Sequence, residues 1–191
     1  ARWIDAFEHT LRLCKVNPGD EVAILAETQS RAINPHLAEL ALDRLGAKPF
    51  HLCVPTPRQR APVPIRSTGA SQAIQQLRPV LAALTSCPLI VDCTVEGLMH
   101  APELPAILKS GARVLSVCNE HPDTLERLLP DEAIKAKVLA AARQVRNAKT
   151  MTVESAAGTK LTVMIEGAAT VGIWGYTDKP GTLAHWPAGL L

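Results

Sequence analysis

The sequence predicts an α/β fold with a doubly wound, mostly parallel sheet flanked by helices. Short apolar runs alternate with amphipathic helical segments over residues 1–149, and this alternation is typical of parallel sheets. Near residue 150 the apolar period changes from that of a helix to that of a strand, which indicates an antiparallel β-hairpin. The 191 residues are 47% hydrophobic, enough for a sizeable core. We expect a Rossmann-like domain over residues 1–149 and a hairpin with a Gly/Pro-rich linker over residues 150–191.

Apolar spacing and turn residues define the first four elements. Trp3, Phe7 and Leu11 lie at helical spacing, and a turn at 17–20 (NPGD) precedes a short buried strand. Asn34-Pro35 is expected to cap the next helix, whose buried face would consist of Leu37, Leu40, Ala41 and Leu45. The expected elements are helix 3–14, strand 22–26, helix 35–45 ending at Gly46, and strand 49–54.

A long loop interrupts this order at residues 55–69, which contain four prolines and three arginines. Two interpretations remain open for it, a solvated surface loop or a functional or interface segment. Beyond the loop the alternation resumes. The expected elements are helix 71–85, strand 89–93, helix 104–109, strand 113–118, and helices over 124–149 that restart at Asp131-Glu132.

Two alternating runs around a turn at 157–159 (AGT) predict the hairpin. Met151 and Val153 alternate with polar residues in the first run, as Leu161, Val163 and Ile165 do in the second. The remaining stretch is rich in glycine and turn residues and ends on the apolar pair Leu190-Leu191. We expect the chain to be part of a longer protein.

Composition excludes several classes of protein. A net charge of +2 and 3% aromatic residues argue against a nucleic-acid-binding protein. No apolar run reaches the roughly 18 to 20 residues of a membrane span, and the first residues are too polar for a signal peptide. The five cysteines form no C-x-x-C pair, which favours reduced thiols and a cytoplasmic location.

No phosphate-binding loop, dinucleotide fingerprint, nucleophile elbow or H-E-x-x-H motif occurs in the chain. Ser71 lies in a stretch that matches the nucleophile-elbow motif only weakly, and it is expected to cap the helix that follows it. His121 and Asp123 have the spacing of a 2-His-1-carboxylate iron site, with His185 as a conceivable third ligand. The alternative, which we favour, is a capping box in which Asp123 caps a helix and Glu126 closes the box.

Two other histidines are better placed for chemistry. Ligands of open α/β sheets gather beyond the carboxyl ends of the strands, and strand 89–93 delivers Glu96 and His100 to that edge. His185 lies in a Gly/Pro-rich segment beside Trp186, where a rigid turn could hold an imidazole against a flat ring. A surface or hydrogen-bonded histidine remains the alternative for each.

Four stretches resemble the amino-terminal half of the 2,5-dihydroxypyridine 5,6-dioxygenase family, which shares a superfamily with aminopeptidase T-type metallopeptidases. They are residues 63–71 (VPIRSTGAS), 91–104 (VDCTVEGLMHAPEL), 174–178 (WGYTD) and 185–187 (HWP). The resemblance covers most of the chain.

The resemblance implies an Fe(II)-dependent enzyme that cleaves the pyridine ring with O2 and yields N-formylmaleamate in nicotinate or nicotine breakdown. The family's iron ligands, two histidines and an acidic residue, lie in the carboxy-terminal half, so no metal ligand is expected in this chain. His100 and His185 match the family's non-ligand active-site histidines, with His185 as base and His100 orienting oxygen or the ring. Glu96, Met99 and Trp186 are expected to contact the substrate, a small aromatic N-heterocycle.

Two alternatives remain open. The chain could be the amino-terminal half of an aminopeptidase T-like metallopeptidase, or a non-catalytic α/β binding or oligomerisation module. The loop at residues 55–69 and the apolar end of the chain also favour a homo-oligomer.

Overall fold

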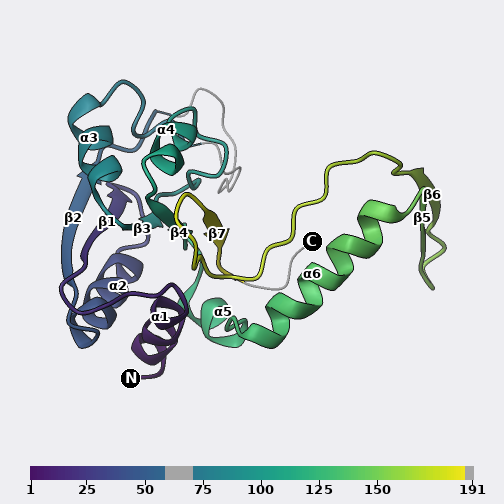
Figure 1. The fold of residues 1–191 in the computed structure, drawn as a ribbon, viewed down its shortest axis with the longest axis horizontal. Coiled ribbons are helices and arrows are strands. Elements are labelled where there is room, and N and C mark those ends of the chain that lie inside the picture. Colours follow the sequence, from purple (N-terminus) through teal and green to yellow (C-terminus); the bar gives the residue numbers. More distant parts are fainter. Residues whose placement is uncertain (59–70, 188–191) are drawn as a thin grey trace.

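A five-stranded parallel sheet forms the centre of the computed structural model, which describes residues 1–58 and 71–187 (Figure 1). Its strand order is β2-β1-β3-β4-β7. The chain adds β2 on one side of β1 and then returns to add β3 on the other, so the topology reverses between β1 and β3. The predicted doubly wound α/β fold is confirmed. The strands are β1 (Glu21–Glu27), β2 (Lys48–Val54), β3 (Leu89–Cys93), β4 (Arg113–Ser116) and β7 (Leu183–His185).

Helices cover both faces of the sheet because the central strands are apolar on both sides. Val22 and Ile24 of β1 join one core cluster, whereas Ala23 and Leu25 join the other. The first cluster is covered by α1 (Arg2–Leu13), α2 (Ile33–Arg44) and α5 (Pro122–Arg127), and the second by α3 (Arg78–Ser86) and α4 (Leu104–Lys109).

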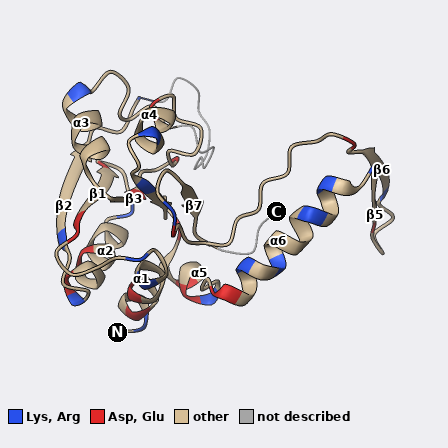
Figure 2. Ribbon diagram, in the orientation of Figure 1, with Lys and Arg blue, Asp and Glu red and all other residues tan. Residues whose placement is uncertain are grey.

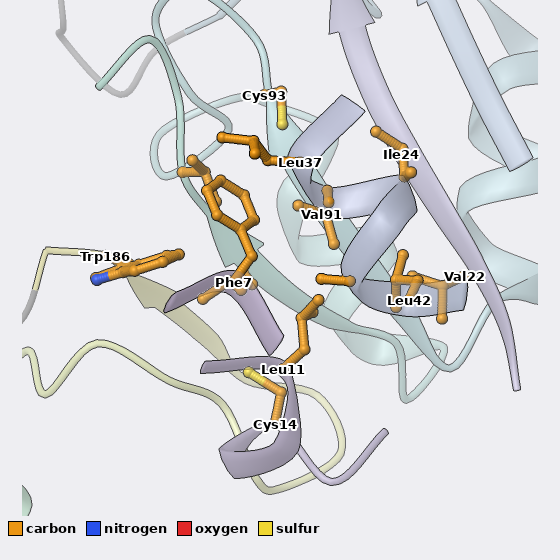
Figure 3. Close-up of a cluster of buried hydrophobic side chains, with 14 of the residues drawn as sticks. Phe7, Leu11, Cys14, Val22, Ile24, Leu37, Leu42, Val91, Cys93 and Trp186 are labelled. Atoms are coloured by element: carbon orange, nitrogen blue, oxygen red, sulfur yellow. The ribbon is translucent and has the colours of Figure 1, made fainter. Parts of the chain in front are cut away.

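Trp186 packs at the edge of the first cluster (Figure 3). Its ring meets Phe7 edge-on with centroids 5.0 Å apart, and its indole N–H donates to the Leu128 carbonyl at 3.0 Å. The side chain is fully buried and hydrogen-bonded. It therefore fixes the end of β7 against α1 and the segment after α5.

Three details of the helices differ from the prediction. Helix α3 begins at Arg78 rather than at residue 71, because residues 73–76 form turns ahead of Pro79. Helix α2 begins at Ile33, so Asn34 lies in its first turn and does not cap it. Leu40 is exposed, and the buried face is formed by Leu37, Ala38, Ala41 and Leu42.

An arm extends away from the sheet (Figure 1). It consists of α6 (Glu132–Asn147) and an antiparallel hairpin of β5 (Thr150–Glu154) and β6 (Lys160–Met164), as the sequence predicts. Asp131 caps α6, and basic residues follow along its length (Figure 2), which suits the helix dipole. The chain then returns along α6 to add β7 at the sheet edge, a strand that the sequence did not predict. The division at residue 150 stays a prediction.

The base of the arm is held by Lys135 of α6. Its ammonium lies 2.8 Å from a carboxylate oxygen of Asp178, and the two side chains are only 17% and 19% exposed. The same ammonium lies over the rings of Trp174 and Tyr176, at 5.5 and 5.0 Å from their centroids. A side chain at Gly172 would collide with Val138, since an added Cβ would lie 2.5 Å from Val138 Cγ1.

The hairpin at the far end of the arm has an apolar face that nothing in the described chain covers. The register pairs Met151 with Val163 and Val153 with Leu161, so these four side chains share one face. Met151, Val153 and Leu161 are exposed. A two-stranded hairpin is only marginally stable alone in water.

We predict that Lys135→Met lowers the free energy of unfolding by about 1 to 3 kcal/mol, because it leaves the mostly buried Asp178 carboxylate without its cation. Urea unfolding measures the change. Lys137→Met, on the same helix but exposed, is the matched control and should change stability by less than about 0.5 kcal/mol. Equal losses in the two variants would contradict the prediction.

Candidate functional site

The site lies at the carboxyl edge of the sheet. Parallel strands end there together, and the topology reverses between β1 and β3, which is where open α/β sheets bind ligands. The last residues of three of the strands are polar, namely Glu27 of β1, Ser116 of β4 and His185 of β7.

Asp92, one residue before the end of β3, organises this edge. Its Oδ1 accepts hydrogen bonds from the Thr94 amide at 3.0 Å and the Thr94 hydroxyl at 2.6 Å. Its Oδ2 accepts from the Leu98 amide at 2.8 Å and the Ser116 hydroxyl at 2.9 Å. Asp92 is fully buried, and burial raises the pKa of its carboxyl while these donors oppose the rise. One carboxyl group thus joins β3, β4 and the segment after β3.

We call residues 94–100 the β3–α4 loop. The Gly97 amide donates to the Thr94 hydroxyl at 3.0 Å, and Gly97 has a φ of +80°, which closes a tight turn. The loop brings Glu96, Met99 and His100 to the carboxyl edge, the place that the sequence predicts for Glu96 and His100. Glu96 and Met99 are half-buried and His100 is exposed.

Glu27 is a second buried carboxyl group at this edge and was missed by the sequence analysis. Its Oε1 accepts from the Ser71 hydroxyl at 3.1 Å and from the Val95 amide at 3.2 Å. Burial raises the pKa of the Glu27 carboxyl, and the nearby Asp92 charge raises it further. The sequence offered one sign of it, because Glu27 is an acidic residue that directly follows the apolar run of β1.

Ser71 joins Glu27 and the β3–α4 loop and does not cap a helix. Its amide donates to the Gly97 carbonyl at 2.9 Å, while its hydroxyl donates to Glu27. The expectation that Ser71 caps the following helix was wrong, because α3 starts seven residues later. The Ser71 hydroxyl accepts from the Ala73 amide at 3.2 Å, in the turns that precede α3. The rest of the expected 55–69 loop, from residue 59 onward, lies outside the described residues.

His185 ends β7 and pairs in register with Ser116 of β4. It is half-buried, and burial lowers the pKa of its imidazole, although the charges of Glu120 and Asp92 oppose this effect. The imidazole therefore tends to be neutral at neutral pH. β4 separates β7 from β3, which places the strand that carries His185 about 10 Å from the strand that leads to His100.

Hydrogen bonds join the segment after β1 to the segment after β4 at the same edge of the sheet. The Asn34 side-chain amide donates to the carbonyls of Cys118 and Glu120, at 3.3 and 2.9 Å. The Arg31 amide donates to the Asn119 side chain at 2.6 Å. The segment after β1 is thereby tied to the segment after β4, and Asn34 does not cap α2 because it lies inside the first turn of that helix.

His121 and Asp123 do not form an iron site. The helix cap of α5 is His121 and not Asp123, because the Asp123 amide donates to His121 Nδ1 at 3.2 Å. Asp123 instead accepts from the Trp3 indole at 3.0 Å. Within residues 1–58 and 71–187, no group of three His, Cys, Asp or Glu side chains could hold a metal ion. The described residues of this chain therefore do not fit an iron centre.

Comparison with known proteins decides the family. The family model of 2,5-dihydroxypyridine 5,6-dioxygenase matches residues 2–191. The chain belongs to the 2,5-dihydroxypyridine 5,6-dioxygenase family. A curated Pseudomonas putida protein with that name is 33% identical over 193 residues, covering 100% of this chain and 54% of the relative. The solved structure of the Pseudomonas putida dioxygenase has a TM-score of 0.84 and 32% identity, covering 98% of this chain and 54% of that one.

These findings confirm the resemblance and the fold that it implies for this dioxygenase-family chain. The chain spans about half the length of the curated relative that it matches, and the match favours the dioxygenase family over the aminopeptidase T-like alternative. The comparisons do not test the expected site residues, so the roles of these residues stay predictions. The residues are His185, His100, Glu96, Met99 and Trp186. For Trp186 the structure supplies a packing role, since its side chain is fully buried.

We predict that Asp92→Ala lowers the free energy of unfolding by about 3 to 5 kcal/mol, because it leaves four buried donors without an acceptor. The shift of the urea midpoint measures the loss. Asp43→Ala, at an exposed position of α2, should change stability by less than about 0.5 kcal/mol. A loss below about 1 kcal/mol for Asp92→Ala would contradict the central place of this carboxyl group.

Proposed function

We propose that this chain is the substrate-side, amino-terminal part of an oxygen-consuming enzyme that cleaves the ring of 2,5-dihydroxypyridine to N-formylmaleamate. The observation that carries the proposal is the family match over residues 2–191, together with 33% identity to the named dioxygenase. The carboxyl edge of the sheet also supports the proposal, because its buried, hydrogen-bonded polar side chains gather where this fold class binds ligands.

His185 is the proposed base. A neutral imidazole can take a proton from a ring hydroxyl, and the lowered pKa of His185 favours the neutral imidazole at neutral pH. The charges of Glu120 and Asp92 favour the imidazolium that this transfer creates. The substrate loses its hydroxyl proton to the imidazole and becomes an anion.

The remaining side chains at this edge have supporting roles in the proposal. His100, exposed at the end of the β3–α4 loop, orients the oxygen or the ring. Glu96 and Met99 of the same loop shape the pocket for the substrate ring. Trp186, packed against Phe7, supports this pocket from the core.

We also propose that the enzyme binds Fe(II), with ligands in the carboxy-terminal half as the resemblance implies. Iron would supply the site at which oxygen and the ring meet. The described residues of this chain do not fit an iron centre, so the metal ligands would come from the carboxy-terminal half.

A homo-oligomer in the cytoplasm is the proposed working state. The exposed apolar face of the hairpin supports an oligomer, because burial of such a face stabilises a marginal two-stranded sheet. All five cysteines are free and four of them are buried, which supports a reducing compartment. No helix among the described residues combines the length and the apolar character that crossing a membrane requires.

The test is oxygen uptake by the complete polypeptide, this chain followed by its carboxy-terminal half, after anaerobic loading with Fe(II). We predict uptake with 2,5-dihydroxypyridine and loss of the pyridine absorbance. His185→Ala should lower turnover by roughly 10² to 10⁴, the usual contribution of a general base. His36→Ala, at an exposed position of α2, is the matched control and should leave turnover unchanged. Peptide hydrolysis without ring cleavage would refute the function, and a loss below tenfold in His185→Ala would refute the role of the base.

A further inference from the structure

We propose that Glu27 is a positioning residue that fixes the β3–α4 loop, and with it His100, at the carboxyl edge. The inference rests on the proposed function, since it concerns the loop that carries the proposed active-site histidine. Glu27 itself contacts the loop backbone at Val95, not a residue with an assigned role.

The loop is held from two sides. From β3, Asp92 binds the amides of Thr94 and Leu98, at the two ends of the turn. From β1, Glu27 binds the amide of Val95, between those two points. Without Glu27, the middle of the loop would keep the local bond from the Gly97 amide to the Thr94 hydroxyl and the bond from the Ser71 amide to the Gly97 carbonyl.

Ser71 extends the hold of Glu27 to the far side of the turn. Its hydroxyl donates to the same Oε1 that accepts from Val95, and its amide donates to the Gly97 carbonyl at 2.9 Å. Glu27, Ser71 and the loop thus form a closed ring of three contacts. A shift of the loop breaks at least one of them, so the ring restricts where His100 can lie.

The chemistry of this ring calls for an acceptor and not for a charge. The groups that face the Glu27 carboxyl group are the hydroxyls of Ser71 and Thr56 and the amide of Val95, all of them neutral donors. In the described part of the chain, no Lys, Arg or His forms an ion pair with Glu27, although its side chain is 4% exposed. Burial of a carboxyl group without a cation is costly, and burial raises the pKa of Glu27 accordingly. An apolar residue would serve stability alone, so the carboxyl group is better explained by the loop that it holds.

The experiment compares Glu27→Ala, Glu27→Gln and Ser71→Ala in the complete, Fe(II)-loaded polypeptide. Two readouts are used, kcat/KM from oxygen uptake with 2,5-dihydroxypyridine, and hydrogen exchange of the Val95 amide. Glu27→Ala should lower kcat/KM by about tenfold or more and accelerate Val95 exchange by about tenfold, because misplacement of an active-site group is costly and the amide loses its acceptor.

The other variants separate positioning from general stability. Glu27→Gln keeps an oxygen acceptor and should stay within about threefold of the wild type in both readouts. Ser71→Ala should show a smaller loss in the same direction, and it remains informative if Glu27→Ala does not fold. Glu21→Ala, at the exposed start of the same strand, is the matched control and should change neither readout.

Two results would overturn the proposal. One is unchanged Val95 exchange in Glu27→Ala and Ser71→Ala, and the other is a loss of kcat/KM in Glu27→Gln equal to that in Glu27→Ala. Failure of the proposed function looks different, because the wild type would then take up no oxygen with 2,5-dihydroxypyridine. The exchange of the Val95 amide decides the contact with Glu27 in that case too.

Discussion

The carboxyl group of Asp92 is the constraint on which the active edge depends. It is fully buried and receives four hydrogen bonds, from Thr94, Leu98 and Ser116. Two of the donor residues, Thr94 and Leu98, belong to the loop that leads to His100, and the third, Ser116, pairs in register with His185. One side chain therefore links the loop that leads to His100 to β4, the strand that pairs with the strand of His185. Its charge also favours the protonated form of His185, which opposes the effect of burial.

The fold could be predicted largely from the sequence because local signals agree with long-range packing. The strands of the sheet centre are apolar runs buried on both faces, and the amphipathic helices between them have one buried side. The hairpin followed from alternation and a glycine turn, and Gly158 indeed has a φ of +96°. β7 was missed because three residues at a sheet edge carry no periodic signal, and β4 rather than local sequence determines its pairing.

The errors at the site share one physical cause. Asn34, Ser71 and Asp123 are all residues that favour helix caps, yet each binds a partner far away in the sequence. Asn34 binds carbonyls after β4, Ser71 binds Glu27, and Asp123 accepts from Trp3. Cap preferences describe local competition for the backbone, and they do not include such tertiary contacts. Ser71 keeps a local bond from the Ala73 amide beside its bond to Glu27, yet no helix starts there. Glu27 was missed for the complementary reason, since its donors come from segments 44 and 68 residues away.

The proposed role of His185 as a base requires a neutral imidazole at neutral pH, and a titration of this imidazole by NMR tests the requirement directly. Burial favours the neutral form, so we expect a pKa below the ordinary value of about 6.5. Because the unfolded chain would then bind the proton more tightly, this group makes the fold less stable as pH falls through about 6.5. A pKa of His185 at or above the ordinary value of about 6.5 would contradict the assignment of His185 as the base.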